Sequence, residues 1–448
     1  MIPHPIDPPG PGRFRSLRPL FKMCHDRITP VMDCFQRYGN FVMLDGLDGR
    51  VYLVNEPDAV HELLAVSHRD VRKDTGHQLF LRPVLRNGLL LNEGEAHLKQ
   101  RRMMQPAFHT GRIAKYVETM VAFAERTSGR WRDGQRIDAM GEMMSLALDI
   151  VGKTLFNSEI AEDKRHIASA IEDILRADSI LLLPHGQRII RLPFPRARRF
   201  WRAIATLDDI VFRIIAEHRA SGGEGDLLHM LLEARDEEDG SAMTDDELRD
   251  EVLTLFLAGH ETTASTMTWA WRMLAENPEV EARFHGEIDQ VLGGRPPVME
   301  DAERLPWTRQ IVEETLRLYP PAYFFGRETL REIEILGYRI PPGSQVLLSP
   351  FATHRDPRFF PDPQRFDPER FSAEQRDSRP RNAWFPFGAG PRKCIGERFA
   401  MMEAMLVLAT IGQHWRLCAE GAPRPAIDPR ITLRPKGGMP LTVQRRGA

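Results

Sequence analysis

One of the four cysteines of this 448-residue chain, Cys394, lies in a setting that suits a metal-binding thiolate. It falls within the glycine-rich stretch 387–396, and a helical pattern begins directly after it at Ile395. Glycines let a backbone approach a flat ligand closely, and the positive end of a helix favours the thiolate over the thiol. Phe387 can shield the sulfur from water, and Arg392 can pair with a carboxylate of the ligand. These residue types indicate a porphyrin-type cofactor.

The same stretch carries five residues at a spacing that makes this chemistry specific. They are Phe387, Gly390, Arg392, Cys394 and Gly396. The pattern resembles the haem-binding signature of the cytochrome P-450 family and matches it at every fixed position. With each residue type at about 5% abundance, five chance matches in one window have a probability of about three in ten million. The resemblance implies haem b as the cofactor, Cys394 as the iron ligand, and Gly388 among the residues around the cofactor.

A second set of charged residues fits the same family. Glu314 and Arg317 lie one helical turn apart, where they share a face of the helix. Alone, this spacing is typical of many surface helices. Arg370 follows within 368–371 at the distance that the family shows, and the resemblance implies a buried ion triad of these three residues. Such a triad is structural, and removing one member would leave a buried charge without a partner.

A third motif lies in the middle of a long apolar helix. Ala258, Gly259, Glu261 and Thr262 follow the family pattern of a small residue, glycine, an acid and threonine. The resemblance implies that Gly259 leaves room for dioxygen and substrate beside the cofactor, and that Glu261 and Thr262 pass protons toward bound oxygen. We expect the helix to widen or kink here. The alternative is that Thr262 only bonds the carbonyl four residues earlier.

Further cations stand where the family binds the haem propionates. His97 and Arg101 lie one helical turn apart, and Arg327 follows shortly after Pro320–Pro321. Each alone is typical of a solvated base. Together with Arg392, the resemblance implies a clamp on two carboxylates.

The resemblance also places the walls of a substrate pocket in four segments: the loop before the His97 helix, the central helix, the segment after Pro321, and a late turn. These segments are mostly apolar, so we predict a lipophilic substrate such as a terpenoid, fatty acid, steroid or polyketide. Arg82 and Arg86 either hold a substrate carboxylate or face water. The expected pocket residues are Leu79, Phe80, Leu81, Val84, Leu85, Leu89, Phe256, Ala258, Ala322, Phe324, Phe325 and Met439.

Hydrophobic periodicity predicts the elements that must position these residues. A capping-box pattern, Thr244 with Glu247, starts a helix that runs to Asn277 over about 48 Å. A second apolar helix is expected from Ile395 to about Gly412. Short strands are predicted at 41–45 and 50–54 around a Gly/Asp turn, and at 338–340 and 345–348 around a Pro-Pro-Gly turn, each pair as a hairpin.

Composition agrees with one large, mostly helical domain over residues 1–448 with a minor β portion and a proline-rich lead over 1–37. The 61 Lys and Arg against 63 Asp and Glu leave a net charge of -2, which excludes a dedicated nucleic-acid binder. No apolar run reaches the roughly 18 residues of a membrane span. Few cysteines fit a reducing cytoplasm, and Cys24, Cys34 and Cys418 are expected to be small apolar residues.

The resemblance implies a haem-thiolate monooxygenase, which inserts one atom of dioxygen into an organic substrate. The chain holds no glycine-rich dinucleotide motif, so we expect it to receive electrons from a ferredoxin and its reductase, or from a flavodoxin-type donor. We also expect a monomer. The alternatives are a peroxide-driven haem-thiolate enzyme and a non-enzymatic haem-thiolate sensor, neither of which needs the Glu261–Thr262 pair. The cations expected at the donor's docking face are Lys99, Arg102, Arg392, Lys393 and Arg398.

Overall fold

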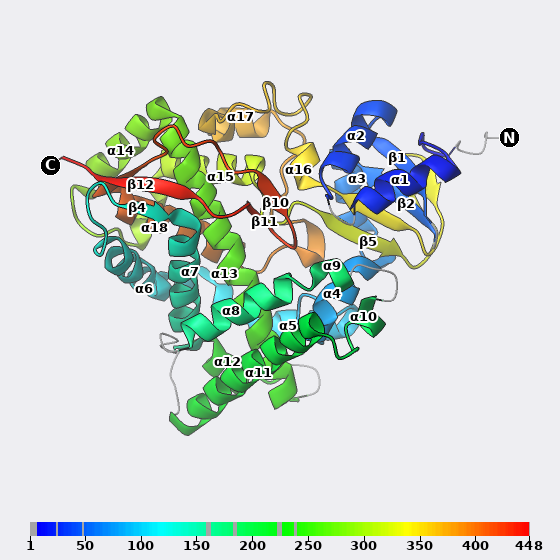
Figure 1. Cartoon of the computed structure of the whole chain (residues 1–448), viewed down its shortest axis with the longest axis horizontal. Helices are drawn as coiled ribbons and strands as arrows, with labels where there is room; N and C mark the ends of the chain where they lie inside the picture. The colour runs from blue at the N-terminus through cyan, green and yellow to red at the C-terminus, as the bar shows by residue number, and fades with distance from the viewer. Residues whose placement is uncertain are drawn as a thin grey trace.

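The computed structural model describes residues 7–23, 26–46, 49–157, 163–181, 186–221, 226–236 and 240–447. Helices make up most of it, and a β-rich part with β1, β2 and β5 lies beside the N-terminus (Figure 1), so the predicted class is confirmed. The helices are α1 (Arg13–Met23), α2 (Thr29–Tyr38), α3 (Pro57–His61), α4 (Thr75–Leu85), α5 (Gly94–Met104), α6 (Thr110–Ser128), α7 (Ala139–Phe156), α8 (Lys164–Leu175), α9 (Asp178–Leu181), α10 (Gly186–Ile189), α11 (Pro195–Ser221), α12 (Leu227–Glu233), α13 (Asp245–Glu276), α14 (Pro278–Leu292), α15 (Pro306–Leu318), α16 (Pro350–Thr353), α17 (Ala373–Asp377) and α18 (Glu397–Gly412).

The strands form a five-stranded sheet, a three-stranded sheet and two hairpins. The larger sheet has the order β1-β2-β8-β5-β3, in which β2 and β8 are parallel and the other pairs antiparallel. The smaller sheet has the order β4-β12-β9. The strands are β1 (Phe41–Asp45), β2 (Arg50–Val54), β3 (Val71–Lys73), β4 (Arg136–Asp138), β5 (Phe325–Thr329), β6 (Ile333–Ile335), β7 (Tyr338–Ile340), β8 (Gln345–Leu348), β9 (Trp415–Cys418), β10 (Ile427–Pro429), β11 (Leu433–Pro435) and β12 (Pro440–Arg445).

One predicted hairpin is confirmed and the other is wrong. β1 and β2 have the predicted bounds and pair antiparallel. β7 and β8 also have the predicted bounds, but β7 pairs with β6, and β8 lies between β2 and β5. The turn that closes the β6–β7 hairpin is Leu336–Gly337, where both residues have positive φ, as a two-residue hairpin turn requires.

The long central helix is confirmed from end to end. α13 begins after the N-cap Thr244, whose hydroxyl accepts from the Glu247 N–H while the Glu247 carboxylate accepts from Thr244. It packs against α7, α11, α15 and α18, and is buried over 248–256 and 263–274. α18 begins at Glu397, two residues later than predicted.

The proline-rich lead folds against the β-rich part. α1 and α2 pack on β1, and Met43 N–H donates to the Pro9 carbonyl at 3.0 Å. Cys34 is buried in this cluster, as expected, and Cys418 is half-buried. Cys24 lies outside the described residues.

Candidate active site

Glycines shape the loop that carries Cys394. Gly388 and Gly390 have φ of 72° and 66°, a region that favours glycine. A Cβ on Gly390 would lie 2.0 Å from the Leu64 carbonyl oxygen, so the loop packs directly on the backbone of 62–66. The Cys394 N–H then donates to the Phe387 carbonyl at 2.9 Å and closes the loop.

The Cys394 side chain lies deep in the molecule and still keeps accessible surface. Burial raises the pKa of its thiol, which the backbone N–H of Gly396 opposes by donating a hydrogen bond to the sulfur. Arg101 and Lys393 also favour the thiolate electrostatically. The sequence therefore places at this sulfur the amide and cations that a thiolate ligand needs.

The middle of α13 has one accessible turn. Ala258 is exposed, and Leu257, Gly259 and Thr262 are half-buried, although the helix is buried on both sides of this turn. A Cβ on Gly259 would meet Val151 of α7 at 3.2 Å. The glycine therefore lets α7 approach, and that it also leaves room beside the cofactor stays a prediction; the most accessible residue of the turn is Ala258.

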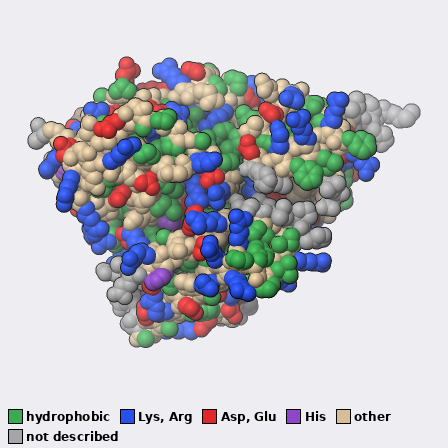
Figure 2. Space-filling view, viewed as in Figure 1, with side chains coloured by type: hydrophobic (Ala, Val, Ile, Leu, Met, Phe, Trp, Pro, Cys, Tyr) green, Lys and Arg blue, Asp and Glu red, His purple; other side chains and the backbone are tan. Residues whose placement is uncertain are grey.

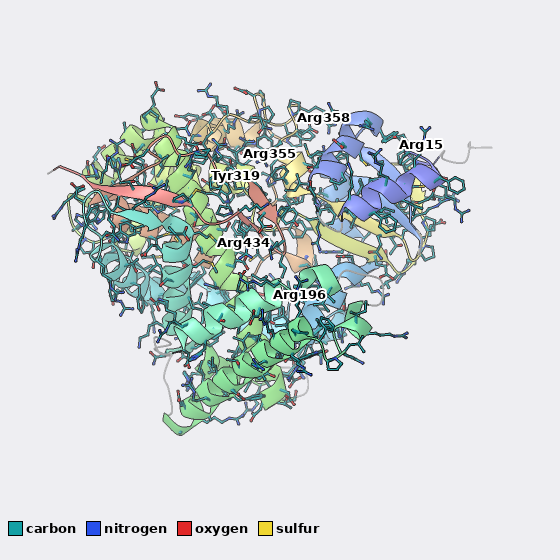
Figure 3. The ribbon with its side chains drawn as sticks, in the orientation of Figure 1. Arg15, Arg196, Tyr319, Arg355, Arg358 and Arg434 are labelled. Carbon is teal, nitrogen blue, oxygen red and sulfur yellow. The ribbon has the colours of Figure 1, made fainter. Side chains whose placement is uncertain are left out.

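Glu261 and Thr262 make separate contacts. Glu261 is buried, and its carboxylate accepts from Thr432 Oγ1 at 2.5 Å and lies 3.7 Å from Arg434 Nη1. Burial raises the pKa of Glu261, and Arg434 and Thr432 oppose this shift. Arg434 extends from β11 toward α13 and α8 (Figure 3), where it also lies 3.6 Å from Glu172.

Thr262 Oγ1 donates to the Ala258 carbonyl at 2.7 Å. The alternative interpretation of Thr262 predicted this bond to the carbonyl four residues earlier. The hydroxyl nevertheless lies on the accessible turn. The expected widening is absent, because α13 is an uninterrupted α-helix throughout its described length.

A cluster of cations lies where α5, β3, β5 and the Cys394 loop meet. His97 is buried, and burial together with Arg392, Lys73 and Arg101 lowers its pKa to about 3. Burial and Arg392 lower the pKa of Arg327 to about 10. Arg101 Nη1 donates to the Lys393 carbonyl at 2.9 Å. The structure thus brings the four predicted clamp residues together.

The cluster also contains residues that sequence reasoning missed. Burial, Arg327 and Arg392 lower the pKa of Lys73 to about 7. Glu93 pairs with Arg392 and accepts from the Lys73 backbone N–H at 2.9 Å, and Asp74 adds a buried acid. Little in the sequence indicated these residues as part of the site, because each lies outside the family motifs.

The charge of this cluster fits a dicarboxylate ligand. The cations Arg101, Arg327 and Arg392 outnumber the acids Asp74 and Glu93 by one, and Lys73, whose pKa is about 7, adds a partial positive charge. Among the described residues, Arg392 Nη1 is buried and has no hydrogen-bond partner. A haem carries two propionates, so its carboxylates would balance the excess and satisfy this donor.

The predicted ion triad lies together at the end of α15. Glu314 and Arg317 are completely buried, with Arg317 Nε at 2.6 Å and Nη2 at 2.8 Å from the two carboxylate oxygens. Arg370 Nε lies 3.5 Å from Glu314 Oε1.

Hydrogen bonds connect this triad with the Cys394 loop. Arg317 Nη1 donates to the His354 carbonyl at 2.8 Å, and the His354 Nε2 accepts from the Phe385 N–H at 2.9 Å. Gly388 N–H donates to the Phe385 carbonyl at 3.0 Å. Burial lowers the pKa of His354 well below its usual value, so its ring is a neutral acceptor. The triad therefore supports the loop.

The predicted pocket residues have different positions. Phe80, Leu81, Leu85 and Phe256 are buried. The Phe256 ring stacks on Phe156 with centroids 4.6 Å apart. Ala322, Phe324 and Phe325 are half-buried, as are Phe387 and Gly396 of the Cys394 loop, and the side chain of Leu79 lies outside the described part.

Met439 stays a prediction as a pocket residue. It is completely buried where β12 meets β4, and its N–H donates to Asp138 at 2.7 Å. A second late segment, at the start of β11, reaches α13: Leu433 O accepts from Ser265 Oγ at 2.7 Å.

A small apolar cavity lies between α8, α11 and α13, next to the accessible turn of α13. Arg86 does not face it: its guanidinium pairs with Asp208 and Asp246. The residues around the cavity are Ile167, Ile171, Leu207, Ile210, Val211, Leu253, Phe256 and Leu257. Those from α8 and α11 were not predicted, because helix packing alone brings them to α13.

Comparison with known proteins decides the family. The family model described as cytochrome P450 matches residues 8–441. The chain belongs to the cytochrome P450 family. The P450 is 42% identical to "Cyclooctatin synthase" of Streptomyces melanosporofaciens, over 88% of this chain and 84% of the relative.

Two further relatives come from Streptomyces. "Cyclooctat-9-en-7-ol 5-monooxygenase" of S. melanosporofaciens is 39% identical over 85% of this chain and 83% of its own length. "Pentalenene oxygenase" of S. avermitilis is 36% identical over 87% of this chain and 86% of its own length.

A solved structure, the haem domain of cytochrome P450DA, is 27% identical and superposes with a TM-score of 0.85 over 98% of each chain. This P450 is therefore a monooxygenase of the oxidoreductase class with haem as cofactor. None of the helices in the described part of the P450 combines the length and apolarity that a membrane crossing requires.

Proposed function

We propose that this P450 is a single catalytic domain that hydroxylates or otherwise oxidises a lipophilic terpenoid with dioxygen and two electrons. The observation that carries the proposal is the accessible Cys394 thiol beside a cluster of cations that is rich enough in positive charge to hold a dicarboxylate ligand. The accessible apolar turn in the middle of α13 supports it. The three Streptomyces relatives, whose names refer to cyclooctatin, cyclooctat-9-en-7-ol and pentalenene, support a terpenoid as substrate.

Haem b would be held by this chain's own groups. Cys394 would ligate the iron, with its sulfur oriented by the Gly396 amide. His97, Arg101, Arg327 and Arg392 would bind the propionates, and Lys73 would join them. When bound, the haem supplies the iron at which dioxygen is activated, and a thiolate ligand favours cleavage of the O–O bond.

Two residues of α13 would control protons in the site. The Thr262 hydroxyl lies on the accessible turn and can donate to an oxygen bound there once its bond to the Ala258 carbonyl opens. Glu261 would replace that proton from the interior. Because Thr432 and Arg434 hold the Glu261 carboxylate, they set how readily it moves.

The substrate would lie against apolar groups. Leu257, Phe324 and Phe325 are half-buried and offer contact surface, and Phe256 is buried beside Leu257. Arg86 is already paired with two acids, so a neutral terpenoid fits the site better than a carboxylate.

Electrons would come from a ferredoxin with its reductase, or from a flavodoxin-type donor, to a cytoplasmic monomer. The expected docking cations Lys99, Arg102 and Lys393 already contact Ser241, Asp236 and Glu397. Their field is therefore weaker than the sequence suggested, and salt should slow reduction only modestly.

Purified holoenzyme, titrated with cyclic terpenes and with charged small molecules, tests the substrate class. We expect terpenes alone to shift the haem absorption band and to stimulate NAD(P)H consumption with surrogate partners. Shifts caused only by charged compounds would overturn the terpenoid proposal. Turnover with peroxide but never with NAD(P)H would establish a peroxide-driven enzyme, and a spectral response without any product would establish a sensor.

A further inference from the structure

The apolar cavity between α8, α11 and α13 has a uniform wall. All eight of its lining side chains are aliphatic or aromatic, and no polar atom faces the space. A water molecule needs several polar partners to remain in such a space, so an apolar cavity stays dry. The occupant that suits this cavity is therefore small and apolar.

The volume of the cavity limits the occupant further. The space open to the centre of a water-sized sphere is about 10 Å³. One water-sized molecule needs roughly 10–15 Å³ by that measure. The cavity therefore suits a diatomic molecule and excludes the ring of a terpenoid.

The side chains around the cavity do not readily collapse into it. Four of them are β-branched and lie in helices, where each such side chain strongly prefers one rotamer. Phe256 stacks on Phe156 with the ring planes 20° apart, and this contact keeps the Phe256 ring from turning into the space. The cavity is thus a lasting feature of the helix packing. The four β-branched residues are Ile167, Ile171, Ile210 and Val211.

The accessible part of the cavity wall is Leu257. The other seven lining residues are at most 6% exposed, whereas Leu257 is half-buried and lies on the accessible turn of α13 beside Ala258. Leu253, four residues earlier, shares its face of the helix and lines the cavity behind it. The cavity therefore meets the site at Leu257.

On the solvent side, α8 and α11 close the cavity. The two helices pack on each other, and their apolar residues face inward. Figure 2 shows basic and acidic side chains over the outer faces of these helices. A small apolar molecule can thus enter by brief separation of α8 and α11, while a charged or bulky one is excluded.

We propose that this cavity admits dioxygen and passes it to the site past Leu257. A monooxygenase consumes dioxygen, and dioxygen is a small apolar molecule that favours apolar space over water. A ligand of two heavy atoms binds no tighter than about the millimolar range, so the cavity is a station on the way in rather than a store. The inference rests on the monooxygenase activity and not on the identity of the organic substrate.

Crystals of the holoenzyme under krypton pressure test the site directly. Krypton is apolar, is close to dioxygen in size, and is located by its anomalous scattering. We expect a krypton peak bordered by Ile171, Val211 and Leu257. The variant V211I adds one CH₂ group to the wall and should abolish the peak, whereas I210V removes one and should raise its occupancy.

Stopped-flow mixing of the reduced holoenzyme with oxygenated buffer tests the route. V211I should lower the rate constant of dioxygen binding severalfold, because the filled cavity no longer admits the gas. Binding of imidazole to the oxidised holoenzyme and the spectral titration with terpenes should both remain as in the wild type, since these ligands are too large for the cavity.

The matched control is V117I. Val117 of α6 is 2% exposed, as Val211 is, but it lies in a separate cluster with Val121 and Leu406. V117I should keep the krypton peak and the wild-type rate of dioxygen binding. Denaturant unfolding checks that the variants are folded, and if V211I is not, the krypton occupancy of I210V decides.

Three outcomes would overturn the proposal. The first is a wild-type crystal without krypton in the cavity, or an occupancy that I210V does not raise. The second is an equal rate of dioxygen binding in V211I and the wild type. The third is weaker terpene binding by V211I at an unchanged dioxygen rate, which would make the cavity part of the substrate pocket. A failure of the terpenoid proposal leaves the krypton and dioxygen measurements unaffected.

Discussion

Replacing Glu314 by Gln should destabilise the P450 severely and free the Cys394 loop. The substitution keeps the size of the side chain but leaves Arg317, which is completely buried, with no carboxylate. In the wild type, two Arg317 nitrogens lie 2.6 and 2.8 Å from that carboxylate, and the Asp367 N–H donates to it at 2.8 Å. The NH2 group of the Gln side chain would also face one of these N–H donors, and two donors cannot form a hydrogen bond with each other.

Removing one partner of a buried ion pair costs about 3–5 kcal/mol. That is a large share of a total stability of about 5–15 kcal/mol. Because Arg317 holds His354, and His354 holds Phe385 of the loop, part of the loss should appear as weaker haem retention. Denaturant unfolding followed by circular dichroism gives the free energy of unfolding, and the haem absorption band gives retention of the cofactor.

The control is Glu369→Gln. Glu369 lies next to Arg370 of the triad and pairs with Arg283, but the side chains of Glu369 and Arg283 are both about half exposed. An exposed pair contributes about 1 kcal/mol or less. Equal, small losses of unfolding free energy in E314Q and E369Q would refute the reasoning, because the buried pair would then count no more than a solvated one.

Three further variants probe the site. Burial raises the pKa of Glu251 from 4.5 to about 8. Between these two pH values the unfolded state has released a proton that the folded state keeps, so the free energy of unfolding falls as the pH rises. In denaturant titrations E251Q should lose this pH dependence, and its free energy of unfolding at pH 8 should exceed that of the wild type by on the order of a few kcal/mol. T432V removes a hydrogen bond to a charged acceptor, about 1.5–3 kcal/mol, so the pKa of Glu261 rises further and the pH profile of turnover moves upward. K73M removes a propionate cation, and transfer of haem to an acceptor apoprotein should accelerate about tenfold.

Each of these has a contradicting outcome. For E251Q it is an unfolding free energy that changes with pH as in the wild type. For T432V it is an unmoved pH profile, and T442V, at a threonine in β12, serves as its control. For K73M it is an unchanged transfer rate, with K115Q as the control for loss of a surface lysine.

Features within one element could be predicted from the sequence. The bounds of α13 follow from Thr244, Glu247 and the apolar run between, because capping and helical periodicity act over a few residues. The pairs His97 with Arg101 and Glu314 with Arg317 likewise follow from helix geometry. Long-range strand pairing could not be predicted in this way: β8 pairs with β2 and β5, although its nearest neighbour in sequence is β7.

The sequence by itself determined the family and the residues whose chemistry defines it, since the Cys394 motif and its glycines lie in one short loop. Only the tertiary structure decided which distant groups act on them. Thr432 is 171 positions from the Glu261 that it binds, and Arg392 is 299 positions from Glu93. Such contacts depend on how helices and strands pack, and packing is set by the whole core rather than by local spacing.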